Sequence, residues 1–213
     1  MSRSFLLLLI DLIIPPRNTA LVVRELILAD MGQRMLSESE HGGILPYHDP
    51  DVRALVWEVK YYANKRAVQL CAAVLAEQLL AVAAETLGTP LLIPIPMHPT
   101  RRRERGHNQT EILCEAALPI LQQHTSATAA LFDYAPWALA RVRHTPQQQG
   151  LPEYHRRKNV RLSMLAPDPA LVRGKICVVV DDVTTTGATF TEATRALKKA
   201  GACRVVCIAL AQS

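Results

Sequence analysis

The sequence predicts an α/β fold, in which a mostly parallel sheet carries helices on both faces and a small helical segment precedes it. Short apolar runs rich in β-branched residues alternate with longer segments of helical periodicity along most of the chain. Runs of this kind are strands buried on both faces, as in parallel sheets whose connections are helices. With 213 residues, 49% of them hydrophobic, the chain is long enough for one such domain and a small appendage.

Residues 1–45 are expected to form the N-terminal helical segment. Residues 5–14 are apolar apart from Asp11, which predicts a packed helix. The run is too short to span a membrane and no small-residue cleavage site follows it, so we expect neither a membrane span nor a signal peptide. Residues 20–35 predict a second, amphipathic helix. Four of its side chains are expected to be buried: Leu21, Leu26, Ile27 and Leu28.

Residues 46–213 are expected to form the main domain, which begins at the end of a polar, turn-rich loop. That loop covers residues 37–50. Strands and helices then alternate, as their apolar periods indicate. We expect helices at residues 51–65 and 66–87, a strand at 91–95, a helix from Asn108 with a capping box to Glu111, a low-information connection at 122–136, and strands at 137–143, 160–165 and 204–211.

Positive charge is concentrated in two short runs, residues 101–105 and 156–158, within a net charge of +5. Such runs suit a polyanion such as a nucleic acid, although charge alone fits solvated loops equally well. We expect weak, salt-sensitive binding to single-stranded DNA. Because the chain has only three phenylalanines and two tryptophans, stacking is expected to add little.

The cysteines lie inside apolar segments and form no CxxC pair. This pattern is typical of reduced core thiols in a cytoplasmic protein, and it argues against a disulfide framework or a zinc site. The five residues are Cys71, Cys114, Cys177, Cys203 and Cys207.

The most informative stretch is a strand, a polar loop and a helix within residues 175–201. Residues 176–180 are an unbroken apolar run and predict a buried strand. From Phe190 onward, apolar residues recur at three- and four-residue steps until Gly201, which predicts a helix. Residues 181–189, Asp-Asp-Val-Thr-Thr-Thr-Gly-Ala-Thr, lie between them.

The composition of this loop suits a sugar phosphate. A helix start has unpaired N–H groups and favours an anion, and Gly187 lets the backbone approach it closely. The carboxylates of Asp181 and Asp182 suit sugar hydroxyls, or a magnesium ion that the phosphates also hold. Hydroxyls that can donate to phosphate oxygens come from Thr185, Thr186 and Thr189. The alternative, an aspartate turn with a threonine cap, needs one such residue and leaves the others unexplained.

Residues 178–189 resemble the signature with which type I phosphoribosyltransferases bind 5-phosphoribosyl-1-pyrophosphate (PRPP). That signature is an apolar strand, two acidic residues and a Thr-Thr-Gly-x-Thr loop, and Thr184 stands where the family more often has an apolar residue. The rival phosphate loops GxxxxGK[ST] and GxGxxG do not occur in the chain.

Further segments resemble one branch of that superfamily, the ComF (competence protein F) family. Their order and spacing agree from about residue 47 to the C-terminus, although His107 stands where the family usually has phenylalanine and the connection 122–136 looks longer than usual. The segments are Lys60-Tyr61, Ile93-Pro94-Ile95-Pro96, Arg105-Gly106-His107-Asn108-Gln109, Thr145/Gln148/Leu151 with Arg156 and Asn159-Val160, and Gly174. ComF proteins typically open with cysteine pairs that form a zinc knuckle; Pro15-Pro16 remains here without any cysteine, so no zinc is expected.

The resemblance implies a role for each part of the site. Asp181 and Asp182 would contact the ribose hydroxyls, and Mg²⁺ would be held mainly by PRPP, with these two carboxylates as candidate ligands. The 5-phosphate would lie on Thr185, Thr186, Gly187, Ala188 and Thr189. The pyrophosphate loop would be Pro96, Met97 and His98. A mobile loop over the reaction would include Arg143, Thr145, Gln148 and Arg156.

Two functions are compatible with this resemblance. The first is a phosphoribosyltransferase, a pentosyl glycosyltransferase that moves ribose 5-phosphate from PRPP to an acceptor with release of pyrophosphate. The alternative is a non-catalytic PRPP-binding competence protein, acting in DNA uptake and natural transformation through single-stranded DNA or protein partners. They differ in whether an acceptor pocket exists, and the sequence names neither the acceptor nor the oligomeric state, for which a homodimer is one option.

Overall fold

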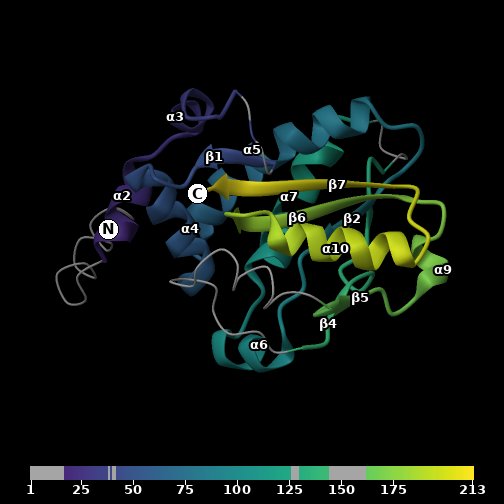
Figure 1. Ribbon diagram of the computed structural model, residues 1–213. Coiled ribbons are helices and arrows are strands. Elements are labelled where there is room, and N and C mark those ends of the chain that lie inside the picture. Colours follow the sequence, from purple (N-terminus) through teal and green to yellow (C-terminus); the bar gives the residue numbers. More distant parts are fainter. Residues whose placement is uncertain (1–16, 38, 40–41, 126–129, 144–161) are drawn as a thin grey trace, which may run out of the picture.

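A five-stranded sheet with every neighbouring pair parallel forms the centre of the computed structural model (Figure 1), which describes residues 17–37, 39, 42–125, 130–143 and 162–213. The strand order is β1 (Gly43–Pro46), β7 (Arg204–Gln212), β6 (Ile176–Thr184), β2 (Leu91–Pro94) and β3 (Asp133–Tyr134). A separate antiparallel pair joins β4 (Ala140–Arg141) to β5 (Met164–Leu165). The predicted α/β class is confirmed.

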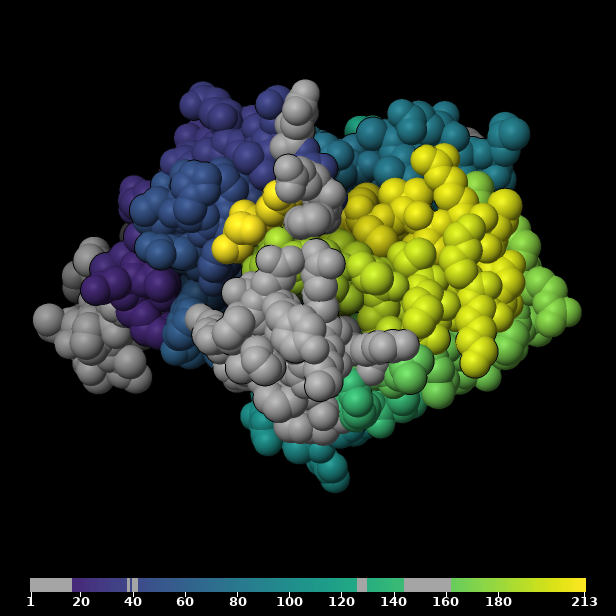
Figure 2. All heavy atoms as spheres, viewed as in Figure 1, coloured from purple at the N-terminus to yellow at the C-terminus, as the bar shows by residue number. Residues whose placement is uncertain are grey.

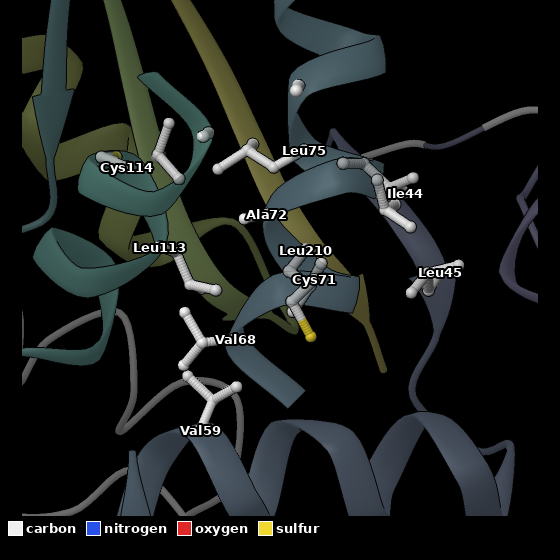
Figure 3. Packing of buried hydrophobic residues seen from close by; sticks show 14 of the residues in the cluster. Ile44, Leu45, Val59, Val68, Cys71, Ala72, Leu75, Leu113, Cys114 and Leu210 are labelled. Carbon is white, nitrogen blue, oxygen red and sulfur yellow. The ribbon is translucent and has the colours of Figure 1, made fainter. Parts of the chain in front are cut away.

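Helices cover both faces of the sheet because the strands alternate between two apolar clusters (Figure 1). In β6, Val178 and Val180 face α4 (Pro50–Tyr62), α5 (Lys65–Ala84) and α7 (Gln109–Gln122), whereas Cys177 and Val179 face α10 (Ala188–Lys199). Figure 3 shows the first cluster, where side chains of α5 and α7 pack against β7. These side chains are Val68, Cys71 and Leu75 of α5 and Leu113 of α7, and Leu210 belongs to β7.

Helix α5 is the predicted core helix. By length and composition alone it is apolar enough to cross a membrane, and it is the only such helix in the described part of the chain. Its buried residues, among them Leu75 and Leu79, pack against α7 and the sheet. A long buried helix in an α/β core meets the same criterion, so the finding does not argue for a span.

The direction of the chain reverses at the boundary between β2 and β6. From β2, the chain passes through α6 (Pro99–Arg105) and α7 to β3 on one side; from β6, it passes through α10 to β7 on the other. In open parallel sheets, a ligand crevice lies outside the carboxyl ends of strands at such a point. Strand β6 also extends past β2, whose last residue pairs with Val180.

The N-terminal segment is helical, as expected, but its detail differs from the prediction. The single helix at 20–35 is two helices, α2 (Asn18–Glu25) and α3 (Leu28–Gln33), separated by extended backbone at Leu26 and Ile27. The break changes which face is buried: Val23, Leu26 and Met31 are buried. The expectation was wrong for Leu21, Ile27 and Leu28, which are exposed. The helix predicted at 5–14 lies outside the described residues.

The loop expected at residues 37–50 contains β1, a strand that sequence analysis missed. Four residues with no alternation of polarity carry little strand signal, and the strand forms because it pairs with β7. Gly42 has a left-handed φ of 74°, and a side chain there would collide with the Cys207 carbonyl. Because β1 pairs with one edge of β7 and β6 with the other, β7 lies inside the sheet. The domain boundary predicted at residue 45 falls within β1, and the division into two domains stays a prediction.

Other element bounds differ in length. The strand predicted at 137–143 covers only Ala140–Arg141. Strand β3 lies within residues 122–136, for which the sequence predicted a connection of low information. Of the cysteines, Cys71, Cys114 and Cys177 are buried, whereas Cys203 is exposed, so the expectation of a core thiol was wrong there.

The buried carboxylate of Glu58 fastens the N-terminal segment to α4. It accepts hydrogen bonds from Arg17 (3.1 and 3.2 Å), from the Thr19 hydroxyl (2.6 Å) and from the Asn64 amide (2.9 Å). The Arg66 side chain also donates hydrogen bonds to the carbonyls of Val23 and Leu26 at the end of α2. Figure 2 shows the purple N-terminal helices and the blue α4 gathered at one end of the molecule.

We expect Glu58→Ala to lower the free energy of unfolding by about 2–4 kcal/mol, because three donors lose their acceptor while half-exposed Arg17 regains water. Denaturant unfolding measures this, with exposed Glu25→Ala as the control. Burial raises the pKa of Glu58, but hydrogen bonds from Arg17, Thr19 and Asn64 outweigh it and hold the pKa below its usual range. The stabilisation is therefore present above the unfolded pKa and lost as the pH falls through the folded one. Equal losses for both variants would contradict the role given to Glu58.

Candidate functional site

The two aspartates lie in strand β6 itself, whereas sequence analysis expected them in the loop. Asp181 pairs in register with Ala209 and Thr184 with Gln212, so the ladder to β7 continues four residues past Val180. The loop proper is only residues 185–187. The longer ladder holds both carboxylates on a rigid element at the carboxyl edge of the sheet, next to the crevice defined by the topology.

Asp182 is held by side chains from two helices. Its Oδ2 accepts a hydrogen bond from Gln109 Nε2 at 3.2 Å and lies 3.9 Å from Lys60 Nζ. Its Oδ1 accepts from the backbone N–H of Val183 at 2.9 Å. Asn108 positions Gln109, because it caps α7 and its Nδ2 donates to the Ile95 carbonyl beyond β2.

The predicted capping box at this helix forms only in part. Asn108 Oδ1 accepts from the Thr110 N–H at 3.2 Å, as a cap does. Glu111 Oε1 accepts from the side chain of Asn108 and from Arg102 (2.7 Å). Glu111 thereby connects α7 to the arginines of α6.

Asp181 is almost fully buried beside a second carboxylate. Burial raises its pKa well above the usual range, the charge of Asp182 raises it further, and Arg141 acts in the opposite direction. Burial also lowers the pKa of Arg141, whose Nε donates to the Pro96 carbonyl at 3.0 Å. A buried pair of like charges is costly, so a cation or hydroxyl donors at this point would relieve the repulsion.

No side chain accepts hydrogen bonds from the backbone N–H groups that begin α10. Gly187 adopts a left-handed conformation (φ 66°), and no side chain caps the helix there. The Thr186 hydroxyl is buried and has no hydrogen-bond partner, which in the described part of the chain is true of only one other side-chain group, the Ser163 hydroxyl. Thr185, Ala188 and Thr189 surround this point and are buried or half-buried. This arrangement suits an anion.

The remaining predicted site residues lie partly within the described structure. Pro96, Met97 and His98 follow β2 and are half-buried, and His98 Nδ1 accepts from the Thr100 N–H at the start of α6. Arg143 is exposed after β4. The other mobile-loop residues, Thr145, Gln148 and Arg156, lie outside the described residues.

Sequence analysis missed three residues that the fold brings to the aspartates: Lys60, Gln109 and Arg141. Lys60 and Gln109 belong to segments that carried the ComF resemblance, and that resemblance was the available signal. Arg141 carried no signal, because it approaches Asp181 only through the β4–β5 pair. In the part of the chain that the structure describes, no three His, Cys, Asp or Glu residues cluster as a metal site.

Comparison with known proteins defines the class. Residues 126–213 match the family described as phosphoribosyl transferase domain. A hypoxanthine phosphoribosyltransferase from Staphylococcus aureus superposes with a TM-score of 0.39 at 12% identity, over 68% of this chain and 63% of that one, too weak a likeness to argue from. The family match and the parallel sheet with its strand–loop–helix unit give a type I phosphoribosyltransferase fold.

Two relatives narrow the class to a family. DNA utilization protein YhgH of Salmonella typhi is 29% identical over 176 residues, which are 81% of this chain and 69% of that protein. Competence protein F of Haemophilus influenzae is 30% identical over 116 residues, which are 52% of this chain and 44% of that protein. These two relatives and the domain match support a ComF-family type I phosphoribosyltransferase.

The raised pKa of Asp181 predicts that the ligand-free site destabilises the fold. The stabilisation that a protonated Asp181 contributes is fully present below the unfolded pKa of about 3.9 and is lost as the pH rises through the raised folded pKa. Asp181→Asn stays neutral and should melt above the parent at pH 8, by about 2–4 °C for each kcal/mol relieved, and the gap should shrink toward pH 4. Scanning calorimetry measures it, with exposed Asp133→Asn as the control. A variant that melts below the parent at pH 8 would mean that Arg141 outweighs the repulsion.

Proposed function

We propose that this site binds PRPP with Mg²⁺ and transfers its phosphoribosyl group to an acceptor, releasing pyrophosphate. The observation that carries the proposal is the buried, unpartnered Thr186 hydroxyl at the uncapped start of α10, a few residues after the buried pair Asp181–Asp182. Anion donors at one end and acceptor-only carboxylates at the other match a sugar phosphate.

The residues divide between the two ends of such a ligand. The 5-phosphate would accept hydrogen bonds from the Thr186 hydroxyl and from the N–H groups that begin α10, which Gly187 leaves accessible. The ribose hydroxyls would donate to Asp181 and Asp182. The pyrophosphate would lie against residues 96–98, near Arg141, whose guanidinium is already fixed to Pro96.

The two carboxylates also fit a magnesium ion, which proteins commonly hold through one or two carboxylates together with substrate phosphates. Bound there, the ion would neutralise charge on the pyrophosphate leaving group. The N-terminal segment needs no zinc on this proposal, because Arg17, Thr19 and Arg66 fasten it to α4 and α5. Unfolding on treatment with a chelator would contradict that statement.

Transfer breaks the bond between the ribose C1′ and the pyrophosphate oxygen and forms a bond from C1′ to the acceptor nucleophile. The electron pair of the broken bond leaves with pyrophosphate. No side-chain nucleophile is required, so the chain contributes by holding both ends of PRPP and fixing their geometry. Rigid placement of both carboxylates in β6 supports this role.

A second candidate function is a PRPP-binding role in DNA uptake, exercised in the cytoplasm through single-stranded DNA or competence proteins. It is favoured by the names of the relatives, DNA utilization protein and competence protein F. Helix α6 adds support, because it carries four arginines in seven residues. Both functions use the same PRPP site.

Binding of PRPP is tested by calorimetry on three variants. Thr186→Val removes one donor to a charged group and should weaken PRPP binding about 10- to 30-fold. Asp182→Asn should weaken PRPP binding and spare inorganic phosphate, because it acts at the ribose end. Gly187→Val should abolish binding of both, since its backbone is left-handed. The matched control is Thr191→Val, because the Thr191 hydroxyl already donates to the Gly187 carbonyl. Binding of PRPP by Asp182→Asn at parental affinity would remove the ribose assignment.

Catalysis is tested separately by following pyrophosphate release from PRPP with pooled nucleobases and amines. The enzyme hypothesis predicts release that depends on one pool and disappears in Asp181→Asn. Tight PRPP binding without release from any pool would favour the second candidate function.

A further inference from the structure

Two aromatic rings form an exposed platform on α4. Trp57 is 44% exposed, and its ring centroid lies 4.3 Å from that of Tyr61, with the planes tilted by 44°. The two residues are four apart and so share one face of the helix. The third aromatic residue of this helix, Tyr62, is covered by the guanidinium of Arg17 at 3.4 Å. Trp57 and Tyr61 therefore lie together on one side of α4 in the described structure, and grouped surface aromatic rings are typical of interaction sites.

The platform is bordered by arginines from two elements. The guanidinium of Arg105, at the end of α6, lies 5.0 Å over the Tyr61 ring and donates to Gln109 Oε1 at 3.1 Å. Arg53 precedes Trp57 by one helical turn on the same face of α4. Arg101 and Arg103 belong to α6 as well.

The carboxylates nearby offset only part of this positive charge. Asp49 and Asp51 pair with Arg34, Glu111 pairs with Arg102, and Glu58 is buried among its donors. Glu104 of α6 is exposed, and its charge acts on Arg101 of the same helix. The surface is therefore aromatic at its centre and basic around it.

We propose that helices α4 and α6 form a binding site for single-stranded nucleic acid, in which an unpaired base stacks on Trp57 and Tyr61 and the arginines of α6 contact the phosphates. Stacking on an exposed ring needs a base whose face is free, which a duplex does not offer. The basic border gives charge complementarity to the strand, and PRPP has no base to occupy the platform. This inference deepens the second candidate function by giving it a location and a ligand chemistry.

The site adjoins the proposed PRPP site without sharing its residues. Lys60 of the same helix lies 3.9 Å from Asp182, whereas the Tyr61 ring contacts Trp57 and Arg105. The expectation that stacking adds little came from the low aromatic content. The proposal departs from that expectation because α4 places Trp57 and Tyr61 together beside the basic run.

The test uses the fluorescence of Trp57 as its direct readout. In Trp137→Phe, which changes an exposed residue, Trp57 is the remaining tryptophan. A 20-nucleotide oligothymidylate should quench its emission, and an abasic oligonucleotide of equal length and charge should not. Emission that is unchanged at saturation with oligothymidylate overturns the proposal.

Affinity provides the second readout, by fluorescence anisotropy at low salt. Trp57→Ala should weaken binding of oligothymidylate roughly five- to hundredfold and leave the abasic oligonucleotide unchanged, whereas Trp57→Phe should keep most of the affinity. The controls are Trp137→Ala and, for charge, exposed Lys199→Gln on α10. Parental affinity of Trp57→Ala for oligothymidylate would overturn the proposal. Asp182→Asn should bind the oligonucleotide normally while losing PRPP, which separates failure of this site from failure of the PRPP site.

Discussion

The burial of two adjacent carboxylates at the carboxyl end of β6 is the constraint on which the arrangement of the site depends. Asp181 and Asp182 are each 7% exposed, and the ladder from β6 to β7 holds their backbone in place. Burial raises the pKa of Asp181, and Arg141 acts in the opposite direction, whereas Lys60 and Gln109 contact the Asp182 carboxylate. On the proposed function, a cation or the hydroxyl groups of a bound sugar phosphate would relieve the remaining repulsion between the two carboxylates.

The helix that follows β6 connects the two ends of this site. Glu192 of α10 is buried, accepts a hydrogen bond from the Met164 N–H and pairs with Arg195, which in turn donates to the Met164 carbonyl. Met164 is the partner of Arg141 in the β4–β5 pair. The helix whose first turn offers the anion donors therefore also fixes the element that carries Arg141. A displacement of α10 would therefore move its own first turn and the β4–β5 pair that carries Arg141 together.

Helix α4 has a comparable linking role on the other side of the sheet. Its buried Glu58 accepts hydrogen bonds from the N-terminal segment, its Lys60 lies 3.9 Å from Asp182, and its Trp57 and Tyr61 form the aromatic platform. Arginine–carboxylate contacts hold the described part of the N-terminal segment: Arg17 pairs with the buried Glu58, and Arg34 pairs with Asp49 and Asp51.

The sequence by itself determined the α/β class and the strand–loop–helix unit of residues 175–201, whereas phosphate binding by Thr186 and Gly187 stays a prediction. These features follow from local patterns, because periodicity shows which face is buried and a helix start defines its own donors. Only the tertiary structure decided the pairing of β1, the break between α2 and α3, the approach of Arg141 to Asp181 and the grouping of Trp57, Tyr61 and Arg105. Each of these joins residues from separate elements, and their free energy comes from contacts that form only when the sheet and its helices pack together.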